Sequence, residues 1–161
     1  MDAGTLAWGI TSSALVLFMT PGVAFFYGGL VKAKSVISMM MMSFGAMALI
    51  AVLWILYGFN MAAVSDPWAF AGNPFSNFAL SSPELSSSDF VLALFGSTFA
   101  IITVALISGA IADRARFGSW MIFAGVWATV VYFPVAAWVW GGGWIMNLGT
   151  TLFGEESGIA V

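Results

Sequence analysis

The chain has 161 residues, of which 61% are hydrophobic and only 7% are charged, and its mean hydropathy is +1.03. This composition lies outside the range of ordinary water-soluble domains, and a net charge of −3, from seven acidic and four basic residues, offers no basic surface for nucleic acid. Because cysteine and histidine are absent, disulfides, thiolate metal sites and the commonest general base are excluded. We therefore expect a protein that is not an enzyme and has no catalytic residues, metal site or cofactor.

Four long segments of the chain are almost free of charge. A hydrocarbon core about 30 Å thick needs about 20 apolar residues for each helical crossing, and segments of this kind occupy residues 6–31, 36–64, 90–112 and 117–139. The sequence thus predicts an all-α, polytopic membrane helical bundle with four transmembrane helices.

The basic residues indicate how these helices are oriented. All four lie in two tight pairs, Lys32 with Lys34 and Arg114 with Arg116, each between two apolar segments. Since lysine and arginine near helix ends favour the cytoplasmic side, both short connections are predicted to be cytoplasmic. The N-terminus and the loop at residues 65–88 are then extracellular.

Proline and small residues interrupt the helical segments. Thr20-Pro21-Gly22 predicts a kink in the first segment, because proline lacks an amide hydrogen and clashes with the preceding turn. Pro134 in the fourth segment favours either a simple kink or a carbonyl opened toward a neighbour or a pore. Small residues four apart, such as Gly9 and Ser13 or Ala105 and Gly109, favour close packing of helices.

The loop at residues 65–88 is rich in proline, asparagine and serine and contains four aromatic residues, Trp68, Phe70, Phe75 and Phe78. These aromatic side chains favour anchoring at the membrane interface, or alternatively a cap over the bundle. At the end of the loop, Ser88 and Asp89 are the candidate N-cap of the third helix.

The third and fourth segments bring three aromatic residues to the same side of the membrane. Phe95 and Phe99 are four residues apart and share one helix face, while the fourth helix runs outward and ends near Trp140. A tryptophan ring stabilises a partly desolvated cation by about 0.5–2 kcal/mol. The alternatives are ordinary packing for the two phenylalanines and interface anchoring for Trp140.

Four ordered blocks of the sequence resemble the signatures of the Amt/Mep/Rh ammonium transporters. The blocks are MTPGVAFFYGGLV at 19–31, STFAIIT at 97–103, GAIADRARF at 109–117 and WVWGGG at 138–143. The resemblance covers nearly the whole chain.

This resemblance implies a trimer of bundles with eleven spans each and an extracellular N-terminus, of which the chain is the N-terminal part with about four spans in a single domain, 1–161. It implies a multi-pass protein of the cell membrane that transports ammonium or ammonia, with methylammonium as a further substrate and the lipid bilayer and two further copies as partners. By motif position, Phe95 and Phe99 correspond to a phenylalanine gate and Trp140 to the outer ammonium-recruitment site. A PII-type regulatory protein is the implied partner of the full-length form.

The sequence also departs from the family pattern. The chain stops before the expected fifth span, which carries the first pore histidine, and Gly96 stands where many members have glutamine. The alternative function is therefore a truncated, non-transporting membrane module or a sensor-type subunit.

The orientation can be tested by labelling, since the chain has no natural cysteine. Cysteines introduced as Ser81→Cys and Glu155→Cys should react with an impermeant thiol reagent outside intact cells, whereas Ala33→Cys and Ala115→Cys should not. Labelling of Ala33→Cys from outside would contradict the predicted orientation.

Overall fold

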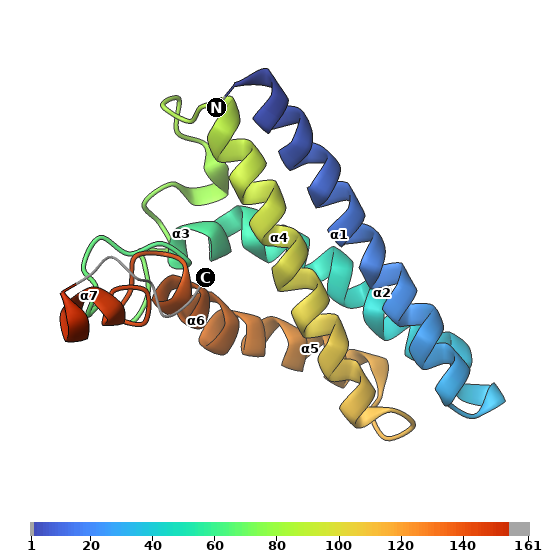
Figure 1. Ribbon diagram of the computed structural model, residues 1–161. Coiled ribbons are helices and arrows are strands. Elements are labelled where there is room, and N and C mark those ends of the chain that lie inside the picture. The colour runs from blue at the N-terminus through green and yellow to red at the C-terminus, as the bar shows by residue number, and fades with distance from the viewer. Residues whose placement is uncertain (1, 155–161) are drawn as a thin grey trace.

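The computed structural model describes residues 2–154, and these form helices joined by turns and one long loop (Figure 1). Within residues 2–154, four helical segments are long and apolar enough to cross a membrane: Ala3–Leu30, Ala33–Met61, Ser87–Ile111 and Phe117–Val139. The first is α1 (Ala3–Leu30), and the second comprises a short 3₁₀ turn (Ala33–Ser35), α2 (Val36–Leu53), a π-helical turn (Trp54–Gly58) and α3 (Phe59–Met61). The third comprises α4 (Ser87–Ile107) and a 3₁₀ turn (Ser108–Ile111), and the fourth comprises α5 (Phe117–Trp127), a second π-helical turn (Ala128–Tyr132) and α6 (Phe133–Val139). A 3₁₀ turn (Phe78–Leu80) lies in the long loop, and α7 (Leu148–Phe153) follows the fourth segment.

Side-chain caps fix where two of the helices begin. The Asp2 carboxylate accepts a hydrogen bond of 2.6 Å from the Thr5 amide, so that α1 begins at Ala3 rather than at residue 6. Helix α4 begins at Ser87 rather than at residue 90, because Ser86 and Asp89 form a reciprocal capping box. The N-cap is thus Ser86 rather than Ser88, and Asp89 takes part in the cap as the partner of Ser86.

Helix α2 lies at the centre of the bundle and packs against α1, α4 and α5. Helices α1 and α4 run side by side in the same direction (Figure 1), and glycines let them approach closely. A Cβ atom at Gly9 would lie 2.6 Å from Val91, and one at Gly109 would lie 2.6 Å from the Tyr27 ring. The Tyr27 hydroxyl donates a hydrogen bond of 3.0 Å to the Leu106 carbonyl, which ties α1 to α4.

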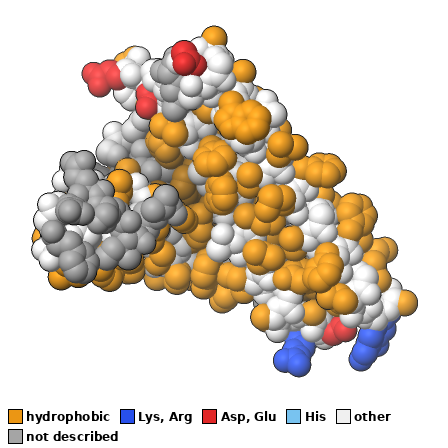
Figure 2. Space-filling model, in the orientation of Figure 1, with side chains coloured by type: hydrophobic (Ala, Val, Ile, Leu, Met, Phe, Trp, Pro, Cys, Tyr) orange, Lys and Arg blue, Asp and Glu red, His pale blue; other side chains and the backbone are white. Residues whose placement is uncertain are grey.

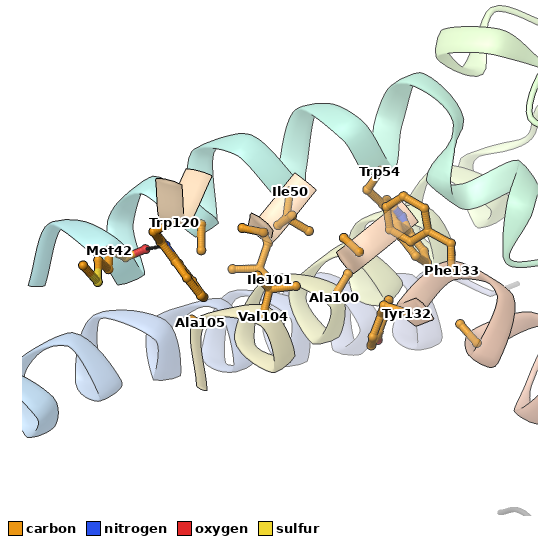
Figure 3. Packing of buried hydrophobic residues seen from close by; sticks show 14 of the residues in the cluster. Met42, Ile50, Trp54, Ala100, Ile101, Val104, Ala105, Trp120, Tyr132 and Phe133 are labelled. Carbon is orange, nitrogen blue, oxygen red and sulfur yellow. Dashed lines mark hydrogen bonds between the residues drawn. The ribbon is translucent and has the colours of Figure 1, made fainter. Parts of the chain in front are cut away.

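The buried core follows α2 from one end to the other (Figure 3). Near one end, the fully buried Trp120 of α5 donates its indole N–H to the Met42 carbonyl of α2 at 2.9 Å. Near the other, Trp54 of the first π turn packs edge-to-face against Phe133 of α6, with ring centroids 5.5 Å apart. The smaller side chains of Ala100, Ala105 and Ala124 fill the space between, which allows the helix backbones to come close.

Charged side chains gather at the two ends of the bundle (Figure 2). We call the end with Lys32, Lys34, Arg114 and Arg116 the basic end. The opposite end, where acidic side chains gather, is called the acidic end. At the basic end, a hydrogen bond from the Ser35 side chain holds the pKa of Asp113 below its ordinary value, with further contributions from the Lys32 backbone and the two lysine charges. Asp113 thus links the two basic connections.

The Trp120 contact offers a direct test of the packing. Trp120→Ala removes a large, fully buried side chain and leaves the Met42 carbonyl without its partner, so it should lower the free energy of unfolding by about 3–5 kcal/mol. The matched control is Ile122→Ala on the same helix, whose side chain is 73% exposed and which should cost about 1 kcal/mol or less. Both can be measured by denaturant titration in detergent micelles, and equal losses would contradict the packing described above.

Candidate functional site

Two π-helical turns lie side by side toward the acidic end and shape the site. The turn Trp54–Gly58 interrupts the second span, and the turn Ala128–Tyr132 interrupts the fourth. They are joined by a hydrogen bond of 2.8 Å between the Tyr57 and Thr129 hydroxyls. The second turn stands directly before Pro134, which has no amide hydrogen to donate, so the widened turn accommodates the proline without ending the helix.

A glycine-rich turn positions Trp140 at the end of α6. The Gly141 carbonyl accepts a hydrogen bond of 2.8 Å from the Val64 amide, and a Cβ atom at Gly141 would collide with the Ala62 carbonyl oxygen. Gly142 follows with a φ of +87°, a backbone conformation that side chains disfavour. Only glycine permits this close approach, which holds Trp140 beside the end of α3.

Helix α4 supplies the two phenylalanines. Phe95 and Phe99 lie on one face of the helix, with ring centroids 4.9 Å apart and an interplanar angle of 69°. This edge-to-face arrangement is a favourable one for aromatic pairs.

These elements enclose an apolar pocket of about 530 Å³ between α4, the end of α2–α3 and α6. It is lined by Trp54, Phe59, Ala62, Ala63, Leu92, Phe95, Gly96, Phe99, Tyr132, Ala136, Trp140 and Gly141. None of these described lining residues carries a formal charge, so any attraction for a cation comes from ring faces and from backbone carbonyls. The pocket is open on one side, where Phe95, Phe99 and Trp140 remain 37%, 38% and 59% exposed.

The long loop closes over the acidic end of the bundle. The Asn60 side chain donates hydrogen bonds to the Pro74 and Asn77 carbonyls, and the Trp138 indole donates to the Phe70 carbonyl at 2.8 Å. Phe70 also packs edge-to-face on Trp138, although its side chain stays exposed, as do those of Trp68 and Phe75. One loop aromatic therefore caps the bundle, and two others remain free to contact the membrane interface.

The structure brings Phe95, Phe99 and Trp140 together in one pocket, and it adds residues that the sequence analysis did not select. Trp54 and Tyr132 are the most notable, because both are nearly buried and both border the π turns. The sequence did contain a signal for Trp54. The number of residues between Lys34 and Trp54 is about the same as the number between Phe95 and Arg114. Equal distances from the basic end place two residues at the same depth.

The profile of the Ammonium Transporter Family matches residues 7–158. The ammonium transporter of Mycobacterium tuberculosis is 47% identical over 91% of this chain and 37% of its own length, and that of Aquifex aeolicus is 44% identical over 95% of this chain and 38% of its own length. The crystal structure of Candida albicans Mep2 superposes with a TM-score of 0.78 at 33% identity, over 92% of this chain and 34% of that one.

Proposed function

The chain belongs to the ammonium transporter family, and we propose that it supplies the outer cation-binding pocket and gate of a complete ammonium transporter. The observation that carries the proposal is the convergence of Phe95, Phe99 and Trp140 on one apolar pocket at the acidic end. The chain spans a little over a third of the length of the curated relatives that it matches, 37% of the Mycobacterium tuberculosis transporter. Transport is accordingly proposed for the complete protein.

In this proposal Trp140 recruits the substrate. Its ring is the most exposed of the three aromatics and stands at the open side of the pocket. An ammonium ion over the ring face gains about 0.5–2 kcal/mol, more as water is removed. This gain is enough to concentrate the ion at the pocket entrance without holding it tightly.

Phe95 and Phe99 form the gate beneath this recruitment position. Their rings lie edge-to-face on α4 and present no polar atom to a hydrated ion, so an ion that passes must lose water. Ammonium can transfer a proton to water at the open side of the pocket and cross an apolar conduit as ammonia, with or without separate passage of that proton. Potassium has no proton to lose, and the gate discriminates against it on that basis.

The orientation, location and partners belong to the same proposal. The basic end faces the cytoplasm by the charge rule, which places the aromatic pocket on the outside of the cell membrane. The proposed assembly is a homotrimer, methylammonium is a second substrate, and a PII-type protein regulates the full-length form.

A non-transporting membrane module is the second candidate, and the open side of the pocket favours it for residues 1–161 alone. An apolar conduit needs walls on every side, and Phe95, Phe99 and Trp140 are partly uncovered in this chain. In the complete transporter, the remaining two thirds of the relatives' length would supply the missing wall.

The gate role predicts a difference between two phenylalanines of α4. In the complete transporter, Phe99→Ala should widen the constriction and reduce ammonium-over-potassium selectivity about tenfold, because the ring lines the pocket. Phe90→Ala is the matched control, since Phe90 is 50% exposed at the start of α4 and does not line the pocket. The selectivity of both variants can be measured as ammonium and potassium fluxes into liposomes. Equal, mild effects of the two substitutions on selectivity would leave only a packing role for Phe99.

The proposed function itself is tested by tracer uptake. Liposomes with the complete transporter should take up labelled methylammonium saturably, whereas liposomes with residues 1–161 alone should match empty liposomes, because the pocket lacks one wall. No saturable uptake by the complete protein would contradict the proposed transport function. Saturable uptake by residues 1–161 would show instead that copies of this chain complete the conduit together.

A further inference from the structure

Helix α4 has a recess in the wall that it presents to the pocket. Leu92, Phe95, Gly96 and Phe99 line the pocket at helical spacing, and Gly96 is the one residue of this face without a side chain. The recess therefore lies directly beside the two rings of the proposed gate.

The indole of Trp54 fills this recess. A Cβ atom built at Gly96 would lie 2.7 Å from Cζ2 of Trp54, closer than real Cβ contacts allow. Trp54 is 4% exposed and lines the same pocket together with Gly96. The distance between α4 and Trp54 is thus set by the absence of a side chain at residue 96.

Trp54 has little freedom to move away from Gly96. Its indole N–H donates a hydrogen bond of 2.9 Å to the Ala93 carbonyl of α4. Its ring packs against Phe133 at 5.5 Å and against Phe59 at 6.1 Å, both near edge-to-face. Any side chain at residue 96 must therefore enter the pocket or drive the indole out of a well-packed position, and either change narrows or distorts the pocket.

We propose that Gly96 and Trp54 together set the width of the cation pocket and so determine the largest substituted ammonium ion that it admits. Gly96 is the specificity-determining residue of this pair, because the indole of Trp54 packs on it and a larger side chain at residue 96 would displace that indole within the pocket wall. With a glycine at residue 96 the pocket accepts methylammonium as well as ammonium. The inference rests on the proposed transport function, because it concerns the size of that function's substrate.

Close contact between glycine and an aromatic ring occurs elsewhere in the bundle, which provides a matched control. A Cβ atom at Gly109 would lie 2.6 Å from the Tyr27 ring, but neither residue lines the pocket. Gly109→Ala thus introduces a similar clash toward the basic end. A second control is Gly22→Ala, where a Cβ atom would meet no other atom within 4 Å.

The test measures initial rates of uptake of labelled ammonium and labelled methylammonium by the complete transporter in liposomes. One methyl group in a close-fitting pocket changes discrimination about tenfold or more, so Gly96→Ala should lower the ratio of methylammonium to ammonium uptake about tenfold. Gly109→Ala and Gly22→Ala should leave the ratio unchanged, even if Gly109→Ala lowers the amount of folded protein. Because the ratio is taken within one sample, it does not depend on that amount.

A second variant tests the wall directly. Trp54→Phe replaces the indole by a smaller ring and should raise the ratio, and the double variant Gly96→Ala with Trp54→Phe should bring it back toward the unmodified value. An unchanged ratio of methylammonium to ammonium uptake in folded Gly96→Ala would overturn the proposal. If Gly96→Ala does not yield folded protein, the same result in Trp54→Phe would overturn it. If the unmodified transporter takes up neither ion, the proposed function is contradicted, and the size limit with it. If the unmodified transporter takes up both ions and the variants have an unchanged uptake ratio, only the size limit is contradicted.

Discussion

The arrangement of this bundle depends on the need to satisfy buried N–H groups where lipid offers no hydrogen-bond acceptor. Two tryptophans meet this need across helices: Trp120 of α5 donates to the Met42 carbonyl of α2, and Trp54 at the end of α2 donates to the Ala93 carbonyl of α4. Hydrogen bonds between membrane helices contribute about 0.6–2 kcal/mol each, and these two also fix position. The Trp120 bond fixes the position of α2 along the axis of α5, and the Trp54 bond fixes the position of α2 along the axis of α4. A shift of one helical turn between either pair of helices would leave an indole N–H without its acceptor.

The aromatic pocket follows from this fixed position of α2. Because Trp54 is held against α4, its indole fills the recess at Gly96 and lines the pocket together with Phe95 and Phe99. The π turns then bring Tyr132 to the same level, and the close backbone contact at Gly141 holds Trp140 at the rim. Hydrogen bonds to two residues that do not line the pocket, Ala93 and Val64, thus hold Trp54 and Gly141 in place, which favours a pocket of fixed width.

Length, hydropathy and charge were sufficient to predict the four helices that could span a membrane, because the cost of burying charge in hydrocarbon dominates every other term. Helical spacing and the direction of the fourth span were sufficient to place Phe95, Phe99 and Trp140 at one end. The roles of these three residues as recruitment site and gate stay predictions.

Other features depend on contacts between residues far apart in the chain, which no local pattern reports. The π turns lie where helices meet through Tyr57 and Thr129, and the Asp113 carboxylate interacts with Ser35 of the other basic connection. The start of α4 was misplaced because a serine-rich stretch offers several possible caps, and only the reciprocal bond between Ser86 and Asp89 selects one of them. The contact between Gly96 and Trp54 is likewise invisible until the depths of two helices are compared.

The central claim is that the aromatic pocket binds the transported cation. The most direct measurement is a pair of cryo-electron microscopy maps of the complete transporter in lipid nanodiscs, with and without saturating methylammonium. The account predicts additional density within about 6 Å of the Trp140 ring centre, bounded by Phe99 and Trp54, only in the map with methylammonium. An unchanged pocket, with the added density elsewhere in the protein, would contradict it.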